Sequence, residues 1–547
     1  MPDLMILKSC SVVELFSDAY RYALPYFQRG YAWQEDHAER LLDDILDVAE
    51  ERRALPWYPL GSIIVAKPDM QSEAWLTDGH QRLVTLTILL AILRDLETEP
   101  DLKVELGACI FGTDRRPRLT TQEKVQHCLS EHVQLEGATA TPYPGDLEAS
   151  TSSEANIIAN RNMLRQRLQA IGVARRRKLA RCLLDRCVIV VMQVASLDIA
   201  RVLFSTMHDT GLKPTTGDLF KCEVLGTIDA DQREESQAAW ELLEAALGRD
   251  KIDLLMRQIA TIATRKVSKA PVEEQLDEHF KLDKAEMARD FVVSRLTPVG
   301  AHMVEIMAAR LATNQSPTLV QRYLRFLSWV RNHDTWMAPA LHWLDKNGAD
   351  EEATVDFLRR LEALAWSQMI IATEPGPRDN RYMQLLQEIS QGRALDAGGV
   401  LTVTAKERAD VRAVLAAPNF IKRRYKQFLL LRIDAALGTE TDPLAPPVAT
   451  VEHVYPGRPA DSSQWRQDFR GGQAAVLRQM LGNLTLLTTD EQNIAKNQDF
   501  VHKLQIYAGG RFAVTRSLAR YDTWKPADVR ARTQELIDIA MRGWRLG

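Results

Sequence analysis

The chain has 547 residues, of which 46% are hydrophobic and 26% are charged, and its formal net charge is −4. This length exceeds what a single hydrophobic core supports, so we expect several domains. The near-neutral charge excludes a protein that binds nucleic acid over its whole surface, so any DNA contact must come from local basic patches. Six cysteines are scattered without a CxxC pair, which excludes a zinc ribbon and a disulfide framework.

The sequence shows neither a signal peptide nor a membrane-spanning segment. Residues 1–3 do not start a basic region followed by a long apolar run, so no signal peptide is expected. The longest strongly apolar run, 188–194, is far shorter than a membrane span. We therefore expect a cytoplasmic protein with no membrane partner. Two basic runs, 175–178 and 422–426, are either solvated helix faces or local DNA contacts.

The first elements of the chain alternate helical and extended patterns. A short helix is predicted near 12–16, an amphipathic helix over 35–51, and a hairpin of two strands over 60–66 and 73–77.

An extended ribbon is predicted over 24–33. Pro25 keeps its neighbourhood extended, and the four aromatic residues of the ribbon can clamp it onto a core. Gln28 and Arg29 are left as the polar pair of this ribbon. They are either surface residues or ligand contacts.

The stretch from Trp75 to Leu86 is typical of a strand end, a tight Asp78–Gly79 turn and the start of an apolar helix. Gly79 can adopt positive φ without steric cost. The unpaired N–H groups of the first helical turn would then point outward beside Arg82. Together with the helix dipole they favour a phosphate or a carboxylate. Plain connectivity without a ligand is the alternative.

The remainder of the N-terminal unit is predicted to be mainly helical. It contains an irregular segment with a surface loop, a long helix, a strand, a further helix, and a last helix with Thr216 as its cap. Their ranges are 98–150 (loop 136–153), 154–184, 188–194, 199–207 and about 214–225.

From about 230 to 440 the apolar positions recur at helical spacing with almost no strand signal, which predicts a helical middle domain. This domain could separate the two ends of the chain, hold the DNA or form a dimer. A proline-rich break at 442–447 indicates a linker. After the linker we expect short strands at 450–456 and 481–487 and a closing helix over 526–544.

The predicted fold class is therefore α+β and predominantly helical. We expect a small N-terminal sheet set among helices, a helical middle and a C-terminal unit with two strands. The expected domains are 1–225, 226–400 and 401–547.

The C-terminal unit carries a chemical pattern. Glu452 and His453 lie on one predicted strand, Asn483 on the next, and Asn493 and Asn497 on the helix and turn after it. This is the pattern of ββα-metal (HNH) nucleases. A neutral histidine deprotonates the water that attacks phosphorus, and an asparagine on the second strand orients it through its other ring nitrogen. One Mg²⁺, held by hard oxygen ligands, stabilises the developing charge. A purely structural Glu–His pair is the alternative.

The chain resembles the GmrSD-type, modification-dependent (type IV) restriction endonucleases at both ends, over roughly 10–225 and 400–547. The N-terminal motifs are Pro-x-x-Gln-Arg-x-x-x-Trp, Asp-Gly-Gln-Gln-Arg and Phe-x-x-x-Asn-x-x-Gly…Asp-Leu-x-Lys. The C-terminal motifs are Glu-His-x-x-Pro, Gly-Asn-Leu-x-Leu-Leu, Asn, Asn-x-x-Phe and Lys. The matching residues are Pro25, Gln28, Arg29, Trp33, Asp78, Gly79, His80, Gln81, Arg82, Phe204, His208, Gly211, Asp218, Leu219, Lys221, Glu452, His453, Pro456, Gly482–Leu487, Asn493, Asn497, Phe500 and Lys503.

The resemblance implies an N-terminal ParB-like domain that binds and hydrolyses a nucleoside triphosphate (NTP). Arg29, Gln81 and Arg82 become the expected phosphate contacts, since the fork of arginine suits phosphate oxygens. Asp78 would position the turn or hold a nucleotide-bound metal. The full set of nucleotide-binding residues implied is Gln28, Arg29, Asp78, Gly79, His80, Gln81 and Arg82.

The resemblance also implies an HNH endonuclease that uses Mg²⁺ or Mn²⁺ to cut modified double-stranded DNA, such as that of phages. His453 is the expected general base and Asn483 the orienting residue. Glu452 and Asn493 are the expected metal ligands, and Asn497 can exchange roles with Asn493.

Two positions depart from the family pattern. His80 replaces the first glutamine of the hallmark, and His208 replaces the usual asparagine of the later motif. Both belong to the N-terminal site, so they bear on NTP hydrolysis more than on DNA cleavage. A gate that only binds nucleotide would tolerate them. The alternative functions are a nucleotide- and DNA-binding sensor with an inactive nuclease half, and an enzyme of NTP chemistry alone. A homodimer is compatible with each.

Overall fold

A computed structural model describes most of the chain. The described residues are 5–52, 56–67, 71–143, 152–206, 215–311, 317–331, 333–438 and 449–547. His208 and Gly211 of the later N-terminal motif and the predicted linker at 442–447 lie outside these ranges, as does the side chain of Phe204.

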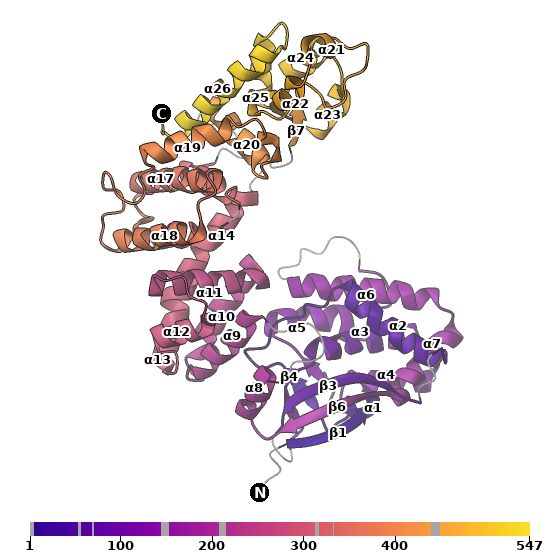
Figure 1. The fold of residues 1–547 in the computed structure, drawn as a ribbon. Coiled ribbons are helices and arrows are strands. Elements are labelled where there is room, and N and C mark those ends of the chain that lie inside the picture. Colours follow the sequence, from indigo (N-terminus) through magenta and orange to yellow (C-terminus); the bar gives the residue numbers. More distant parts are fainter. Residues whose placement is uncertain are drawn as a thin grey trace. The chain divides into compact units, whose positions relative to one another are not determined.

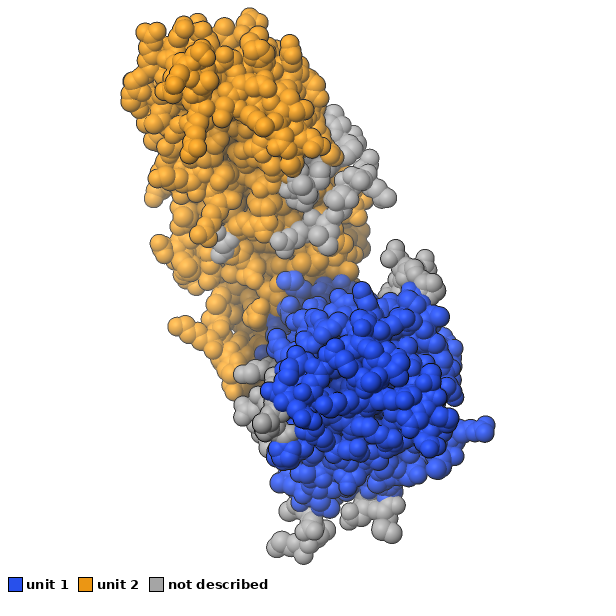
Figure 2. All heavy atoms as spheres, turned by 90° about the vertical axis from the view of Figure 1, so that its right-hand side faces the viewer, with its two compact units in different colours: residues 1–253, 281–290 blue, residues 254–280, 291–547 orange. Residues whose placement is uncertain are grey.

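The chain forms two compact units, coloured blue and orange in Figure 2. The first contains residues 1–253 and 281–290, and the second contains residues 254–280 and 291–547. The further division of the chain at 225 and 400 stays a prediction.

The first unit is built on a six-stranded mixed sheet (Figure 1). Its strands are β1 (Met5–Ser11), β2 (Arg21–Ala23), β3 (Tyr58–Ala66), β4 (Glu73–Asp78), β5 (Leu119–Thr120) and β6 (Cys187–Val194). They lie in the order β1-β6-β3-β4-β2-β5. The pairs β1–β6 and β3–β4 are antiparallel, and the pairs β6–β3, β4–β2 and β2–β5 are parallel. The predicted hairpin and the strand at 188–194 are confirmed, whereas the sequence pattern misses β1, β2 and β5.

Helices lie on both faces of this sheet, with α3 on one face and α8 on the other. The helices up to residue 247 are α1 (Val12–Leu15), α2 (Glu35–Ala49), α3 (His80–Leu96), α4 (Pro100–Ala108), α5 (Glu123–Leu129), α6 (Ser152–Ala170), α7 (Val173–Arg181), α8 (Leu197–Thr206), α9 (Thr216–Thr227) and α10 (Arg233–Leu247).

Three expectations for these helices are wrong. The segment predicted to be irregular contains α4 and α5. The helix predicted over 154–184 is two helices, because the extended backbone of Gly172 (ψ 159°) separates α6 from α7. The cap of α9 is Thr215 instead of Thr216, since the Thr215 side chain accepts a hydrogen bond from the Asp218 N–H.

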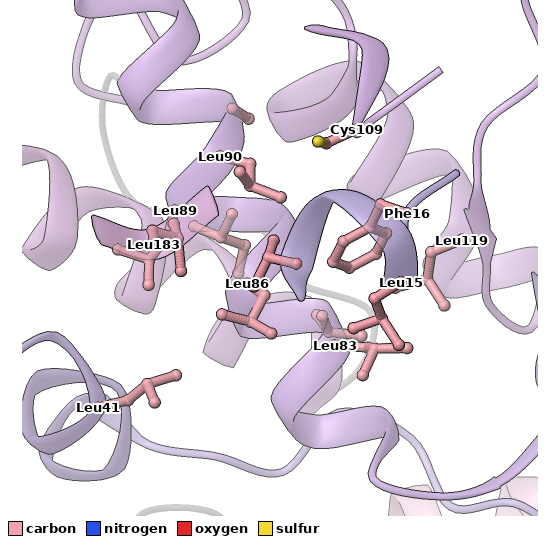
Figure 3. Close-up of a cluster of buried hydrophobic side chains, with 14 of the residues drawn as sticks. Leu15, Phe16, Leu41, Leu83, Leu86, Leu89, Leu90, Cys109, Leu119 and Leu183 are labelled. Carbon is pink, nitrogen blue, oxygen red and sulfur yellow. The ribbon is translucent and has the colours of Figure 1, made fainter. Parts of the chain in front are cut away.

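Helix α3 is the buried centre of the first unit. Every residue from Leu83 to Arg94 is buried, as expected for a helix that is apolar on all sides. Its leucines lie in one cluster with side chains of α1, α2 and the segment before β6 (Figure 3). The opposite face of the sheet, with Ile64 and Met192, is covered by α8 through Ala200. The Asp78–Gly79 turn therefore leads into the best-packed element of this unit.

The middle of the chain is helical, as predicted. No strand occurs between α10 and residue 438 in the described ranges. The helices are α11 (Arg249–Thr264), α12 (Val272–Phe280), α13 (Ala285–Phe291), α14 (Thr297–Leu311), α15 (Leu319–Ser328), α16 (Met337–Asn347), α17 (Glu351–Ile370), α18 (Pro375–Ser390), α19 (Ala405–Leu415) and α20 (Lys426–Leu437).

The C-terminal part of the second unit has the two predicted strands, which pair antiparallel with His453 opposite Leu484. An aromatic core that includes Tyr455, Trp465 and Trp524 packs beside them. The elements are β7 (Thr450–His453), β8 (Leu484–Leu487), α21 (Trp465–Asp468), α22 (Gln473–Arg478), α23 (Thr489–Ala495), α24 (Phe500–Ala508), α25 (Ala513–Arg516) and α26 (Pro526–Gly543).

The whole is a predominantly helical α+β fold with a small mixed sheet, which confirms the predicted fold class. All six cysteines are buried as free thiols. Among the helices that the structure describes, none combines the length and the apolar character that a membrane crossing requires.

Candidate functional site

His453 ends β7 and is only partly exposed. Burial first, and then the positive charges of Lys503, Arg478 and Lys426, lower the pKa of His453 to about 4. The imidazole is therefore neutral at pH 7, which is the form that accepts a proton. The same three cations make this strand end attractive to a phosphate.

The two basic runs of the sequence have different environments. On α7, Arg177 donates to Glu97 at 2.8 Å and Lys178 lies 3.4 Å from Glu51, so the run 175–178 is a salt-bridged helix face. The run 422–426 instead ends at Lys426, whose charge reaches His453. The second run is therefore placed to contact a substrate at β7.

Glu452 has an internal partner. The ammonium of Lys503, on α24, donates to Glu452 Oε1 at 2.6 Å and also to the carbonyl oxygens of His453 at 2.8 Å and Val454 at 3.3 Å. Both side chains are buried. Burial lowers the pKa of Lys503, while the carboxylate of Glu452 raises it. Glu452, expected to be a metal ligand, is thus engaged through Oε1, and only Oε2 is left for a cation.

Asn483, expected to orient His453, makes different hydrogen bonds. Its Oδ1 accepts from the Tyr455 N–H at 2.8 Å and from Trp524 Nε1 at 3.3 Å. Its Nδ2 donates to the carbonyl oxygens of Tyr455 at 3.0 Å and Arg478 at 3.2 Å. These four bonds use the hydrogen-bonding capacity of the amide. Asn483 therefore holds the chain that follows β7, and its action on His453 is indirect.

Helix α26 packs tightly on the entry to β8. A Cβ on Gly482 would lie 2.1 Å from the Val529 carbonyl oxygen, so only glycine allows this approach. The buried guanidinium of Arg532 donates to the carbonyl oxygens of Gly482 and Leu484, at 2.7 Å each. Arg532 cannot be identified from the sequence as a buried residue, because nothing local distinguishes it from the exposed arginines of an amphipathic helix.

Asn493 and Asn497 are exposed, on α23 and the turn after it. Helix α23 contacts both β7 and β8. No group of three or more His, Cys, Asp or Glu side chains in the described residues is arranged to hold a metal ion. The hard oxygen donors among the expected ligands are the Asn493 and Asn497 amides and Oε2 of Glu452. Their chemistry fits Mg²⁺ or Mn²⁺, which take oxygen ligands and keep several waters.

The Asp78–Gly79 turn has the predicted geometry. Gly79 has φ 86° and precedes α3, and its N–H donates to Asp78 Oδ1 at 2.8 Å. A Cβ on Gly79 would lie 2.4 Å from the side chain of Ile63, so glycine is needed for space as well as for φ. No side chain caps α3, so its first N–H groups are directed toward any ligand at the turn.

The two glutamines of the N-terminal site hold the ribbon 24–33 against the turn. Gln81 Oε1 accepts from the backbone N–H groups of Ala32 at 2.7 Å and Trp33 at 3.0 Å, and its Nε2 donates to Gly30 O at 3.0 Å. Gln28, also buried, donates to the Thr77 carbonyl oxygen. Gln81 therefore positions the ribbon, and its phosphate contact stays a prediction.

His80, which departs from the family pattern, is buried. Its Nε2 lies 2.6 Å from Gln81 Nε2. Because Gln81 Oε1 already accepts two backbone donors, the nitrogen of that amide must be the donor, and His80 Nε2 accepts. The histidine thus helps to fix the Gln81 side chain, which in turn holds the ribbon 24–33.

Two arginines remain at the turn. Arg82 Nη1 donates to the Ser62 carbonyl oxygen at 3.1 Å. Burial lowers the pKa of Arg82, and the charge of Asp78 opposes that shift. Arg29 Nη1 lies 3.9 Å from Oδ2 of Asp218, which also accepts from the Thr215 N–H at 2.8 Å.

The fold therefore brings together three sequence motifs at one place: the ribbon 24–33, the turn 78–82 and the start of α9. Lys221 of the later motif lies deeper, where it donates to Glu244 at 2.8 Å.

Comparison with known proteins found two matches. The model of the GmrSD restriction endonuclease N-terminal domain matches residues 12–225. The model of the GmrSD restriction endonuclease C-terminal domain matches residues 406–539. Together they cover more than half of the chain and include both groups of residues described above. No curated protein matches the chain.

Proposed function

The chain belongs to the GmrSD restriction endonuclease family, and on this basis we propose that it is a nucleotide-regulated, Mg²⁺-dependent HNH endonuclease that restricts modified phage DNA. The family makes it a DNA-cleaving hydrolase. The metal, the nucleotide and the modification of the DNA are the parts that we propose.

The observation that carries the nuclease proposal is the neutral imidazole of His453 among three cations. With a pKa lowered to about 4, His453 can take the proton of a water that attacks phosphorus. Lys426 and Arg478 attract the phosphodiester to the same strand end. Cleavage of one P–O bond then leaves a phosphate on one DNA end and a hydroxyl on the other.

Asn493, Asn497 and Oε2 of Glu452 would hold the divalent cation. When bound, the cation supplies charge stabilisation at the phosphate and the leaving oxygen. Lys503 limits Glu452 to one free oxygen, so the two asparagines would carry more of the coordination than the sequence pattern implies.

The nucleotide part of the proposal rests on the turn before α3. Uncapped N–H groups, the helix dipole and the guanidinium of Arg82 form an anion site of the kind that binds phosphates. The ribbon beside this site is held in place by Gln28, His80 and Gln81. The ion pair of Arg29 with Asp218 lies at the edge of the site. We propose that an NTP binds here and regulates cleavage.

A plasmid-nicking assay tests the nuclease. His453→Ala should abolish nicking of supercoiled DNA in Mg²⁺ or Mn²⁺ and leave DNA binding intact. The exposed His502 on α24 offers a matched control, because His502→Ala removes an imidazole away from the strand end. Wild-type cleavage by His453→Ala would refute the assignment. If wild-type protein fails to nick DNA in either metal, the chain is a sensor with an inactive nuclease half.

Nucleotide binding is tested separately by calorimetry with GTP, ATP and CTP. Arg82→Ala should weaken binding about tenfold or more, because charged hydrogen bonds to phosphate are strong. Arg40→Ala, on the exposed side of α2, is the control. Unchanged affinity of Arg82→Ala would place the nucleotide elsewhere. Phosphate release in the absence of DNA would support NTP hydrolysis.

A further inference from the structure

The run 422–426, which leads into α20, concentrates positive charge on the surface of the second unit. Its four cations are Lys422, Arg423, Arg424 and Lys426. Lys422 and Arg424 are exposed, and the other two are partly exposed. None of the four forms an ion pair, as far as the structure describes the chain. In the run 175–178, by contrast, three of the four cations pair with carboxylates.

The run 422–426 is held in a fixed position by its neighbours. Phe420 and Tyr425 are buried, and their rings pack edge to face with centres 6.2 Å apart. The Ile421 N–H donates to the carbonyl oxygen of Gln479 at 3.0 Å, which joins the start of the run to the end of α22. The cations are therefore carried on an ordered backbone, so few backbone degrees of freedom would be lost when they bind a partner.

The run also adjoins the strand of His453. Helix α20 contacts β7, and Gln427 Nε2 donates to the carbonyl oxygen of Ala449 at 2.8 Å, immediately before that strand. The charge of Lys426 contributes to the low pKa of His453. A phosphodiester placed at His453 would therefore have the run beside it.

A fifth cation lies beyond the other end of β7. Arg478 Nη1, on α22, donates to the carbonyl oxygen of Gly457 at 3.1 Å. The next residue, Arg458, is exposed and forms no ion pair with any described residue. The end of α22 thus contacts both the loop of Arg458 and the start of the run 422–426.

Contacts within the protein do not explain these charges. The run precedes and enters the first turn of α20, where the helix dipole is positive and cations are unfavourable. That turn contains no acidic residue, and no side chain caps the helix. Asp461, the acid nearest to Arg458 in the sequence, pairs with Arg466 at 3.0 Å. The positive charge is therefore left for a partner outside the chain.

We propose that the run 422–426 and Arg458 bind backbone phosphates of the DNA duplex that flank the phosphate at His453. This inference rests on the proposed function, and it adds the surface that holds the substrate outside the reacting centre. Arginine forks and lysine ammonium groups match phosphate oxygens in charge, and the arginines also match them in geometry. Backbone contacts carry no sequence information. The surface therefore supplies affinity and register, and other residues read the modification of the DNA.

Full-length protein carrying Lys422→Ala and Arg424→Ala tests the proposal, since both side chains are exposed and their loss should not unfold the chain. The matched control is Lys266→Ala with Lys269→Ala, which removes the same charge from two exposed positions of the second unit outside the run. Binding of a duplex is measured by fluorescence anisotropy in EDTA over a range of salt concentrations, so that cleavage does not interfere. Circular dichroism of each variant checks folding.

We expect the run variant to bind the duplex about tenfold more weakly or worse, and its slope of log K against log salt to fall by about two. The loss should be equal for modified and unmodified duplexes, because backbone contacts do not read bases. The control variant should match wild type. Unchanged affinity and slope in the run variant, or an equal loss in the control, would overturn the proposal.

Nicking of supercoiled DNA by the same proteins separates this inference from the nuclease proposal. The run variant should raise KM and keep kcat, because its two side chains contact flanking phosphates and not the reacting one. A lower kcat with unchanged duplex affinity would also overturn the inference. If wild type binds the duplex through this surface and nicks no DNA in Mg²⁺ or Mn²⁺, the nuclease proposal fails and this one stands. If wild type nicks DNA and the run variant binds and nicks as wild type does, only this inference fails.

Discussion

The ammonium of Lys503 lies 2.6 Å from Oε1 of Glu452 and is fully buried beneath the strand that ends at His453. It also donates to the carbonyl oxygen of His453 at 2.8 Å. One side chain therefore neutralises the carboxylate beside His453, bonds to the backbone of His453 and contributes to its low pKa. We infer that Lys503 positions His453 for the proposed reaction.

Replacing Lys503 with methionine should lower the free energy of unfolding by about 3–5 kcal/mol, because a buried carboxylate would lose its partner. The double variant Lys503→Met with Glu452→Gln should recover much of this loss. Chemical denaturation measures both. Lys406→Met, on the exposed side of α19, should change stability by less than about 0.5 kcal/mol. Equal effects at positions 503 and 406 would contradict the buried pair.

The pH dependence of cleavage should report the low pKa of His453. Its base form persists above about pH 4, so kcat/KM should stay level as pH falls from 8 to 5 and drop near pH 4. An ordinary histidine would lose activity from about pH 6.5. Arg478→Ala removes one of the charges that depress the pKa and should move the acid limb upward. A wild-type limb near 6.5 would contradict the assignment.

The same shift affects stability, with a definite sign. The folded pKa of His453 lies below that of an unfolded histidine, so the unfolded chain binds the proton more readily. The contribution to stability is complete above about pH 6.5 and declines as pH falls towards 4. Denaturation curves of wild type and His453→Ala, compared between pH 7 and 4.5, should therefore converge or cross on the acid side.

Gly482→Ala should destabilise the C-terminal unit by about 2 kcal/mol or more, because the new methyl group would meet the backbone of α26 and α26 would have to move. Cleavage should fall with it, since β8 pairs with the strand of His453. Gly457→Ala is the matched control: its Cβ would meet no atom within 4 Å. Thermal unfolding of the two variants gives the comparison. A Gly482→Ala protein as stable as Gly457→Ala would disprove the close contact.

Gln81→Leu should loosen the ribbon 24–33 and weaken NTP binding together. Leucine leaves the N–H groups of Ala32 and Trp33 without their acceptor, at about 1–3 kcal/mol for each that stays buried. Hydrogen exchange of the ribbon should accelerate, while that of α3 is retained. Gln34→Leu, exposed at the end of the ribbon, serves as the control. Weakened NTP binding with unchanged exchange would instead indicate that Gln81 contacts the nucleotide directly.

Turns and strands whose form depends on neighbouring residues in the sequence are predicted correctly. The Asp78–Gly79 turn follows from one glycine between a β pattern and an apolar run, and its φ of 86° is what that glycine permits. The strands of His453 and Leu484 follow from short apolar runs bounded by turn residues. Two residues show the limit of this reasoning. A single glycine can stay within a helix or end it, and Gly172 ends one. Thr215 and Thr216 could each cap α9, and the packed structure uses Thr215.

The remaining features depend on contacts between distant residues. Strand β1 has a mostly exposed surface and forms because it can pair with β6, which lies much later in the chain, with Ser11 opposite Val188. The partner of Glu452 is Lys503, and the amide of Asn483 bonds to Tyr455 in preference to His453. No spacing rule identifies such partners, because side-chain hydrogen bonds are decided by the packed fold.

Helix α3 is the buried centre of the first unit, and Gly79 of the turn is its N-cap residue. Amides of such a helix exchange with solvent only when the unit unfolds as a whole. A ligand at this turn would therefore dock on an anchor that does not move. Any motion that signals its presence is expected in the segments beside this anchor, the ribbon 24–33 and α9. Labels placed on those two segments should register it, whereas labels on α3 should show no change.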